Sequence, residues 1–283
     1  MEFILSAFAD EAGSSLDEQI HALQEHHIPQ IEIRGVEGKS VCDLPAAQVR
    51  EIGRRLADAG IAVWSIGSPL GKIGVEDDFT PHMEQFYRTL EAARLLGAAN
   101  IRLFSFYVHG DHTAGRDVAF ERLAWFCDEA KGSGVTLCHE NEKGIYGDIA
   151  EHCAEIHQTF PSLRGIFDPS NFIQCGQAVL PAWELLKEQI KYLHIKDCLP
   201  DGTVVPSGFG AGHIREITAD FYERGGRVLS IEPHLADFPG FSFLEEGASD
   251  TKERPRAFST PREAFDEAVR AIHAIIGEGS GLK

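Results

Sequence analysis

VTLCHENE, residues 135–142, is a short run of strand-forming residues that ends abruptly in acidic and amide side chains. A strand that buries apolar residues and then presents a charge predicts that its carboxyl end faces a solvent-filled opening. The same design recurs three times further along the chain, where strand-like runs end at Asp168, His194 and Glu232. We therefore interpret these four strand ends as parts of one site.

The length of 283 residues fits one α/β barrel, which typically takes about 250 residues. Hydrophobic residues make up 43% of the chain and charged residues 25%, as in ordinary globular proteins. We expect a single domain over residues 1–277 and a flexible tail at residues 278–283.

The net charge of -18 predicts a surface that repels phosphate backbones, so we expect no nucleic-acid partner. The sequence has no run of about 18 apolar residues and no basic start typical of a signal peptide, which predicts a cytoplasmic protein with no membrane partner. The six cysteines form no C-x-x-C pair, which indicates reduced thiols instead of a disulfide framework or a zinc ribbon.

Apolar strand-like runs alternate with helical patterns eight times along the chain. The predicted strands are residues 3–8, 30–34, 61–66, 100–105, 135–140, 164–168, 191–195 and 228–232. The predicted helices are residues 16–23, 45–56, 79–96, 117–131, 149–160, 181–186, 214–224 and 261–276. The absence of a hairpin pattern between strands indicates a parallel sheet covered by helices.

Closure into a (β/α)₈ TIM barrel is favoured over an open doubly wound sheet. Metal-ligand residue types end strands that are far apart in sequence, and only a ring brings such strand ends together. No Gly-x-Gly-x-x-Gly motif follows the first strand, which argues further against a dinucleotide-binding sheet. The long segment 234–260 precedes the last helix, and we expect it to form a lid or rim at the active site.

Glu140, Asp168, His194 and Glu232 are the candidate metal ligands. They are separated by 28, 26 and 38 residues, which places them at the ends of successive strands, the fifth to the eighth. Three carboxylates and one imidazole suit one divalent ion, with Mn²⁺ preferred and Mg²⁺, Co²⁺ or Zn²⁺ as alternatives. Because side chains alternate along a strand, only one of His139 and Glu140 points into the barrel mouth, and we choose Glu140.

Other polar residues near the strand ends are candidates for substrate contacts. Glu142 and Lys143 lie on the loop after the fifth strand, and Lys196 and Asp197 directly follow His194. Lys196 could bind a hydroxyl group or stabilise an enolate oxygen, and the alternative is a surface salt bridge.

Two further candidates lie near the second and fourth strands. Arg34 is expected either to bind substrate oxygens or to pair with Glu32 or Glu11, and His109 either lines the mouth or is solvated. The glycine-rich stretch 207–212 resembles a phosphate cradle, but no basic cluster adjoins it, which favours an unphosphorylated substrate.

Four motifs carry a family resemblance: HENEKGIYGD at 139–148, FDPSNF at 167–172, HIKD at 194–197 and IEPH at 231–234. They resemble the sugar phosphate isomerase/epimerase superfamily, the xylose-isomerase-like TIM barrels, which include ketose 3-epimerases and inosose-processing enzymes. The resemblance spans essentially the whole chain.

The resemblance implies a divalent metal held by Glu140, Asp168, His194 and Glu232, with Glu140 and Glu232 as the acid/base pair on opposite faces of the substrate. One residue departs from the epimerase pattern. These epimerases usually carry a histidine three residues after the aspartate, and this chain has Asn171, which can bond a hydroxyl but cannot carry a proton.

We expect a metal-dependent isomerase or epimerase that acts on a sugar, keto-sugar or inositol-derived ketone, preferably unphosphorylated, through a metal-stabilised enediolate. The alternatives are a lyase that dehydrates a keto-polyol or inosose, a non-catalytic sugar-binding barrel, and an endonuclease-type barrel, which would need more histidines and a basic groove. The sequence leaves open whether the chain forms a homo-oligomer.

Overall fold

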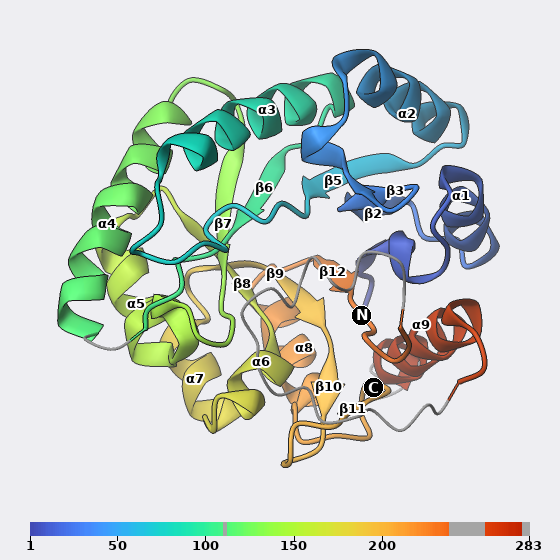
Figure 1. Cartoon of the computed structure of the whole chain (residues 1–283). Coiled ribbons are helices and arrows are strands. Elements are labelled where there is room, and N and C mark those ends of the chain that lie inside the picture. The colour runs from blue at the N-terminus through green and yellow to red at the C-terminus, as the bar shows by residue number, and fades with distance from the viewer. Residues whose placement is uncertain (110–111, 238–257, 279–283) are drawn as a thin grey trace.

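Eight parallel strands form a closed barrel with a surrounding layer of helices in this computed structural model, which describes residues 1–109, 112–237 and 258–278 (Figure 1). The barrel strands are β1 (Ile4–Ala7), β2 (Gln30–Ile33), β5 (Ala62–Ile66), β6 (Asn100–Leu103), β7 (Thr136–Glu140), β8 (Arg164–Phe167), β9 (Ile190–Ile195) and β12 (Val228–Ile231). Their hydrogen-bonded order is β1-β12-β9-β8-β7-β6-β5-β2, and β1 lies beside β2 to complete the ring. The predicted TIM barrel is confirmed.

The helices follow the strands as the periodicity predicts. They are α1 (Leu16–Glu25), α2 (Ala46–Asp58), α3 (Thr80–Leu96), α4 (His112–Glu129), α5 (Ala150–Thr159), α6 (Pro169–Gln174), α7 (Val179–Leu186), α8 (Ile214–Glu223) and α9 (Pro261–Glu278). Helix α1 begins with a capping box, in which Ser15 and Glu18 bond each other's backbone N–H groups. Helix α3 ends at Gly97, whose φ of 67° is the left-handed conformation that glycine adopts without strain.

Short elements depart from the predicted pattern. Two small antiparallel pairs, β3 (Gly35–Val36) with β4 (Lys39–Ser40) and β10 (Asp197–Cys198) with β11 (Val204–Val205), follow barrel strands and were not predicted. Each strand in these pairs has only two residues, which is too short to produce a periodic signal. Helix α6 was also missed. It starts directly after Asp168, which accepts a hydrogen bond from the Asn171 N–H as the N-cap, with Pro169 as the first helical residue.

Buried apolar residues form two clusters on opposite sides of the strands. The larger one lies between the barrel and the helices, and the strands contribute alternate residues such as Ile31, Ile33 and Ile101 to it. The smaller one consists of Cys138, Ile166, Tyr192 and Val228, with Trp64 packed against it. Residues 138, 166 and 192 each precede a candidate ligand by two positions, so this cluster lies inside the barrel beneath the ligands.

The predicted lid or rim, residues 234–260, lies mostly outside the described residues, as do residues 279–283 of the predicted tail. Among the described residues, every helix is too short or too polar to traverse a lipid bilayer. All six cysteines are free thiols, as predicted from the absence of a disulfide pattern.

Candidate metal centre

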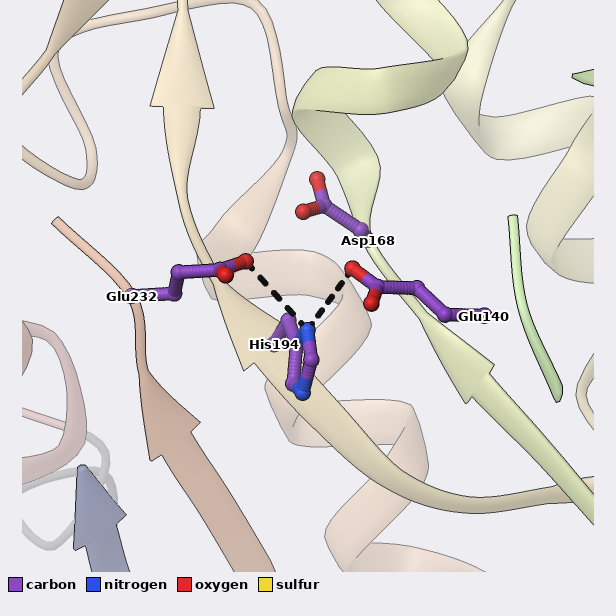
Figure 2. Close-up of side chains that lie close together, drawn as sticks. All are labelled: Glu140, Asp168, His194 and Glu232. Carbon is purple, nitrogen blue, oxygen red and sulfur yellow. Dashed lines mark hydrogen bonds and ion pairs between the residues drawn. The ribbon is translucent and has the colours of Figure 1, made fainter. Parts of the chain in front are cut away.

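Four side chains from four neighbouring strands converge at one end of the barrel. Glu140 is the last residue of β7, Asp168 follows β8, His194 lies in β9 and Glu232 follows β12. One ligand atom of each lies within 4.8 Å of the others, and each residue is at most 2% exposed. Figure 2 shows Glu140 and Glu232 on opposite sides of His194, with Asp168 across from the imidazole. The barrel thus brings together the four residues singled out from the sequence.

Strand alternation decides which residue of the His139–Glu140 pair enters this group. The His139 ring lies on the other face, where its Nε2 is 3.0 Å from Ser105 Oγ and its centroid is 5.9 Å from that of His157 on α5. Burial keeps the pKa of His139 well below its usual value, so this ring is neutral. The choice of Glu140 as the inward-facing residue agrees with this arrangement.

His194 bonds carboxylates through both ring nitrogens. Its Nδ1 lies 2.8 Å from Glu140 Oε1 and 3.4 Å from Glu232 Oε2, and its Nε2 lies 3.1 Å from Glu32 Oε2. Burial alone would lower the pKa of His194, but the carboxylates of Glu140 and Glu32 raise it well above its usual value. Without a bound cation, the imidazolium is the form that this pocket favours.

A buried arginine that sequence reasoning missed connects the two glutamates. Arg102 Nη1 lies 3.1 Å from Glu140 Oε2 and 3.5 Å from Glu232 Oε1, and its guanidinium carbon lies 5.0 Å from the centroid of the Phe8 ring. A signal was present in the sequence, because Asn100 and Arg102 alternate with apolar residues in β6 and therefore share the barrel face. Arg102 holds one oxygen of each glutamate, and the other oxygen of each faces His194.

Arg34 neutralises the acids after the first strand. Its guanidinium makes two hydrogen bonds of 2.9 Å to Asp10 and also lies 3.2 Å from Glu11 Oε1 and 3.3 Å from Glu232 Oε1. Of the roles considered for Arg34, pairing with Glu11 is the one that the structure shows. Glu11, Glu232 and His234 could also hold a cation by distance, but the Arg34 guanidinium already occupies two of these carboxylates.

Lys196 lies beside the other two ligands. Its Nζ is 2.8 Å from Asp168 Oδ2 and 3.5 Å from Glu232 Oε2, and the side chain is 4% exposed. This is a buried ion pair, so the surface salt bridge considered for Lys196 is not what the fold produces. Burial raises the pKa of Asp168 to about 6, and the Lys196 ammonium limits this rise. Burial opposes ionisation of Glu232 as well, but Lys196 and other donors hold the pKa of Glu232 well below its usual range.

The donor set fits a divalent cation. Three carboxylates and one imidazole provide hard oxygen ligands with a single nitrogen, which suits Mn²⁺, Mg²⁺, Co²⁺ or Zn²⁺. Asp168 Oδ2 and Glu232 Oε2 are buried, and Lys196 is 2.8 Å from the first and 3.5 Å from the second. A carboxylate oxygen has room for more than one partner, so a cation among the four ligands could bind both oxygens beside Lys196.

The loop after β7 carries a second ion pair. Glu142 Oε2 lies 3.0 Å from Lys72 Nζ, and Lys72 itself lies over the Phe104 ring at 4.5 Å from the centroid. Burial opposes this charge, but Lys72 and the neighbouring lysines lower the pKa of Glu142 to about 2. Lys143 extends away to bond Gln174 Oε1 at 2.9 Å. Lys72, from the loop after β5, was not among the predicted residues.

Asn171 fixes the strand ends that carry the ligands. Its Nδ2 donates to the Asn141 carbonyl at 2.8 Å. Asn141 in turn exchanges two side-chain hydrogen bonds with the backbone of Asp168, at 2.9 and 3.0 Å. The residue that replaces the histidine of the epimerase pattern therefore ties the loop after β7 to the start of α6.

Asp197 fills the glycine-rich loop that resembled a phosphate cradle. Its carboxylate accepts hydrogen bonds of 2.8–3.0 Å from the backbone N–H groups of Gly208, Gly210 and Gly212, and one of 2.9 Å from Cys198. An internal carboxylate thus occupies the position that an anion would take. His109 is exposed and stacks on Tyr107 with the ring planes 11° apart, so the described structure leaves it outside the buried group.

A family model described as xylose isomerase-like TIM barrel matches residues 22–252. No curated protein sequence matches the chain. Solved structures similar to it include an L-ribulose 3-epimerase, with 17% identity, a TM-score of 0.73, and coverage of 99% of this chain and 96% of that one.

Two other similar structures are described as a zinc-bound protein and as a probable dehydratase. The IOLI protein, solved with a bound zinc atom, has 17% identity and a TM-score of 0.73, with coverage of 98% of this chain and 99% of that one. A probable 3-DHS dehydratase from Bacillus anthracis has 15% identity and a TM-score of 0.68, with coverage of 88% and 100%. At these identities the likeness establishes the shared fold.

Proposed function

Because this chain belongs to the xylose isomerase-like TIM barrel family, we propose that it is a divalent-metal-dependent isomerase or epimerase acting on a sugar, keto-sugar or inositol-derived ketone. The supporting observation is the convergence of Glu140, Asp168, His194 and Glu232 within 4.8 Å at the carboxyl ends of the strands. Active sites of TIM barrels lie at this end.

Glu140 and Glu232 are suited to move a proton between two faces of a substrate. They approach from opposite sides of His194 (Figure 2), and Arg102 fixes one oxygen of each. One carboxylate removes the proton next to a carbonyl, and the other returns a proton from the opposite face or to the neighbouring carbon. A divalent ion held by the four ligands would supply Lewis-acid stabilisation of the negative charge that develops.

Lys196 is the cation best placed to support the same charge. Its ammonium lies beside both Asp168 and Glu232, so an oxygen of a substrate bound between these residues would lie within its reach. Glu142 and Lys72 form the next ion pair along the mouth and are suited to bond the hydroxyl groups of a polyol. Asn171 is suited to position these strand ends, since its Nδ2 bonds the Asn141 carbonyl.

The charge balance favours an uncharged substrate. Seven carboxyl groups surround the site, and they belong to Asp10, Glu11, Glu32, Glu140, Glu142, Asp168 and Glu232. Burial raises the pKa of Glu11 to about 8, which leaves six carboxylates ionised at neutral pH. Four cationic groups face them, from Arg34, Lys72, Arg102 and Lys196, because His194 is neutral once its Nδ1 binds a metal. One dication balances the difference, and a phosphate or carboxylate on the substrate would have to displace an existing ion pair.

A lyase is the second candidate because its first step is the same. Removal of the proton next to a ketone also begins a dehydration, and Lys196 lies where it could assist the departure of a β-hydroxyl group. The product separates the two reactions, since a dehydratase releases water and forms an unsaturated ketone.

The proposal is tested by incubating metal-loaded protein with a panel of ketoses and cyclitol ketones in D₂O and following the substrates by NMR. Deuterium at the carbon next to the carbonyl, together with an epimer or isomer, would support the proposal. An unsaturated product would assign the lyase. If no substrate acquires deuterium while sugars still bind, the non-catalytic sugar-binding barrel is the correct alternative.

A further inference from the structure

Glu32 is a buried carboxylate beneath the ligand group, and it accepts three hydrogen bonds. Tyr192 Oη donates to it at 2.8 Å, Ser230 Oγ at 2.8 Å and His194 Nε2 at 3.1 Å. Glu32 is 0% exposed. A charge buried this deeply is costly unless it is paired and hydrogen-bonded, so its three partners explain how the fold tolerates it.

Two irregularities in the barrel bring these partners together. The register between β2 and β5 shifts after Ile31, so that Glu32 pairs with Ser65 instead of Trp64. The register between β8 and β9 shifts after Gly165, so that Ile166 pairs with Tyr192 instead of Lys191. Tyr192 Oη then lies 2.8 Å from Glu32 and 3.2 Å from Ser65 Oγ. Register shifts of this kind redirect side chains near functional sites.

The imidazole of His194 lies between Glu32 and the ligand group. Its Nε2 faces Glu32, and its Nδ1 faces Glu140 and Glu232. An imidazole nitrogen binds a metal only through a free lone pair, and the hydrogen bond made by the other nitrogen determines which nitrogen is free. An ionised carboxylate only accepts hydrogen bonds, so the ring must present Nε2–H to Glu32.

We propose that Glu32 is a positioning residue that holds the hydrogen of His194 on Nε2 and turns Nδ1 toward the metal. This inference rests on the metal centre of the proposed function. Tyr192 and Ser230 support it by fixing the Glu32 carboxylate, and Ser230 pairs with His194 in the register of β12 and β9. Glu32 touches neither the substrate nor the metal, and it acts through His194.

A purely structural role for Glu32 makes a different prediction. If Glu32 only stabilised the barrel, Glu32→Gln would lower the free energy of unfolding and leave the metal affinity of the folded protein unchanged. If Glu32 orients the ligand, metal affinity falls even where the variant is fully folded. Loss of such a carboxylate behind a metal-binding histidine typically weakens metal binding by about 10–100-fold.

The experiment compares Zn²⁺ affinity, by competition with a chromophoric chelator, in wild type, Glu32→Gln, Tyr192→Phe and Glu155→Gln. Glu155 accepts a bond from Tyr146 Oη at 2.5 Å in the helical layer, so Glu155→Gln is a matched glutamate–tyrosine control. We expect a loss of about 10–100-fold for Glu32→Gln, a smaller loss for Tyr192→Phe and no change for Glu155→Gln. A folded Glu32→Gln variant with wild-type affinity would overturn the inference.

A second measurement applies even if Glu32→Gln does not fold. In ¹⁵N-histidine NMR of Zn²⁺-loaded wild type, His194 should show a metal-bound Nδ1 and a protonated Nε2. The opposite pattern contradicts the proposed role of Glu32. Both readouts are independent of turnover, so a protein that binds Zn²⁺ but exchanges no proton with any sugar or cyclitol would count against the proposed function alone.

Discussion

Lys196 forms an ion pair with Asp168 in which Nζ lies 2.8 Å from Oδ2 and both side chains are buried, at 4% and 0% exposure. Removing one partner of a buried ion pair typically lowers the free energy of unfolding by about 3–5 kcal/mol, because the remaining charge is left uncompensated. Lys196 therefore stabilises the metal-free protein by neutralising Asp168. A metal bound to Asp168 would supply part of the same positive charge.

Lys196→Met should lower the free energy of unfolding of the metal-free protein by about 3 kcal/mol. A saturating divalent metal should reduce this difference, because Asp168 then gains another positive partner. Urea denaturation with a chelator and with Mn²⁺ measures both values. Lys131→Met is the control, since Lys131 pairs with Asp128, the two side chains are 74% and 67% exposed, and surface pairs contribute less than about 1 kcal/mol. Equal losses for the two variants would contradict the interpretation.

Glu140→Gln and Glu232→Gln should each reduce turnover by roughly 10²–10⁴-fold or more at saturating metal. The glutamine amide cannot accept the proton, and it binds a divalent cation more weakly than the carboxylate does. Turnover of an identified substrate measures this effect, and circular dichroism checks that the barrel is intact. Wild-type activity in either variant would rule out that residue as acid or base. Glu155→Gln, outside the barrel interior, should retain activity.

Gly210→Ala should disrupt the loop that encloses Asp197. A Cβ at position 210 would overlap Asp197 Oδ1 and the Cys198 carbonyl oxygen, while the Gly210 N–H donates to Asp197 at 3.0 Å. Overpacking of this kind costs about 1–3 kcal/mol, which thermal unfolding would detect. Gly277→Ala is the control, since a Cβ there meets nothing within 4 Å and alanine favours a helix. A Gly210→Ala variant that unfolds at the wild-type temperature would show that the loop tolerates displacement of Asp197.

His82 should make the protein sensitive to acid. The backbone N–H of Gly71 donates to His82 Nε2 at 2.6 Å, and burial, with help from the Arg122 charge, lowers the pKa of His82 from 6.5 to about 4. The unfolded chain then binds a proton more readily than the native protein, so stability falls as the pH decreases from about 6.5 to about 4. The full effect is about 3 kcal/mol.

His82→Gln should remove that part of the pH dependence, because glutamine can accept the Gly71 hydrogen bond without titrating. Urea unfolding at pH 7, 5.5 and 4.5 would show a smaller decline for the variant than for wild type. Parallel declines would mean that His82 is not responsible.

The strands and the four candidate ligands could be predicted because they depend on local patterns. Alternating apolar runs mark each strand, and a polar residue at the end of a strand in a parallel barrel must face its carboxyl-terminal opening. Glu140, Asp168, His194 and Glu232 were found in this way. The same reasoning separated Glu140 from His139, because neighbouring residues of a strand point to opposite faces.

Interior charges were harder to predict, since their partners come from distant parts of the chain. Arg34 and Glu232 are 198 residues apart, yet their side chains lie 3.3 Å apart once the ring closes. Arg102 and Glu32 lie within strands. A polar residue in a strand is usually expected to face solvent, unless the interior of the barrel is known. The register shifts that place Glu32 opposite Ser65 have no signature in the sequence pattern.

The sequence by itself determined the (β/α)₈ order and the chemical character of the strand ends, because strand and helix periodicity are properties of neighbouring residues. The tertiary structure alone decided which charges neutralise one another. Arg102 bridges Glu140 and Glu232, Lys196 pairs with Asp168, and Asp197 turns away into its own glycine-rich loop. These pairings depend on barrel closure and strand register, which set the distances between side chains that the chain order leaves far apart.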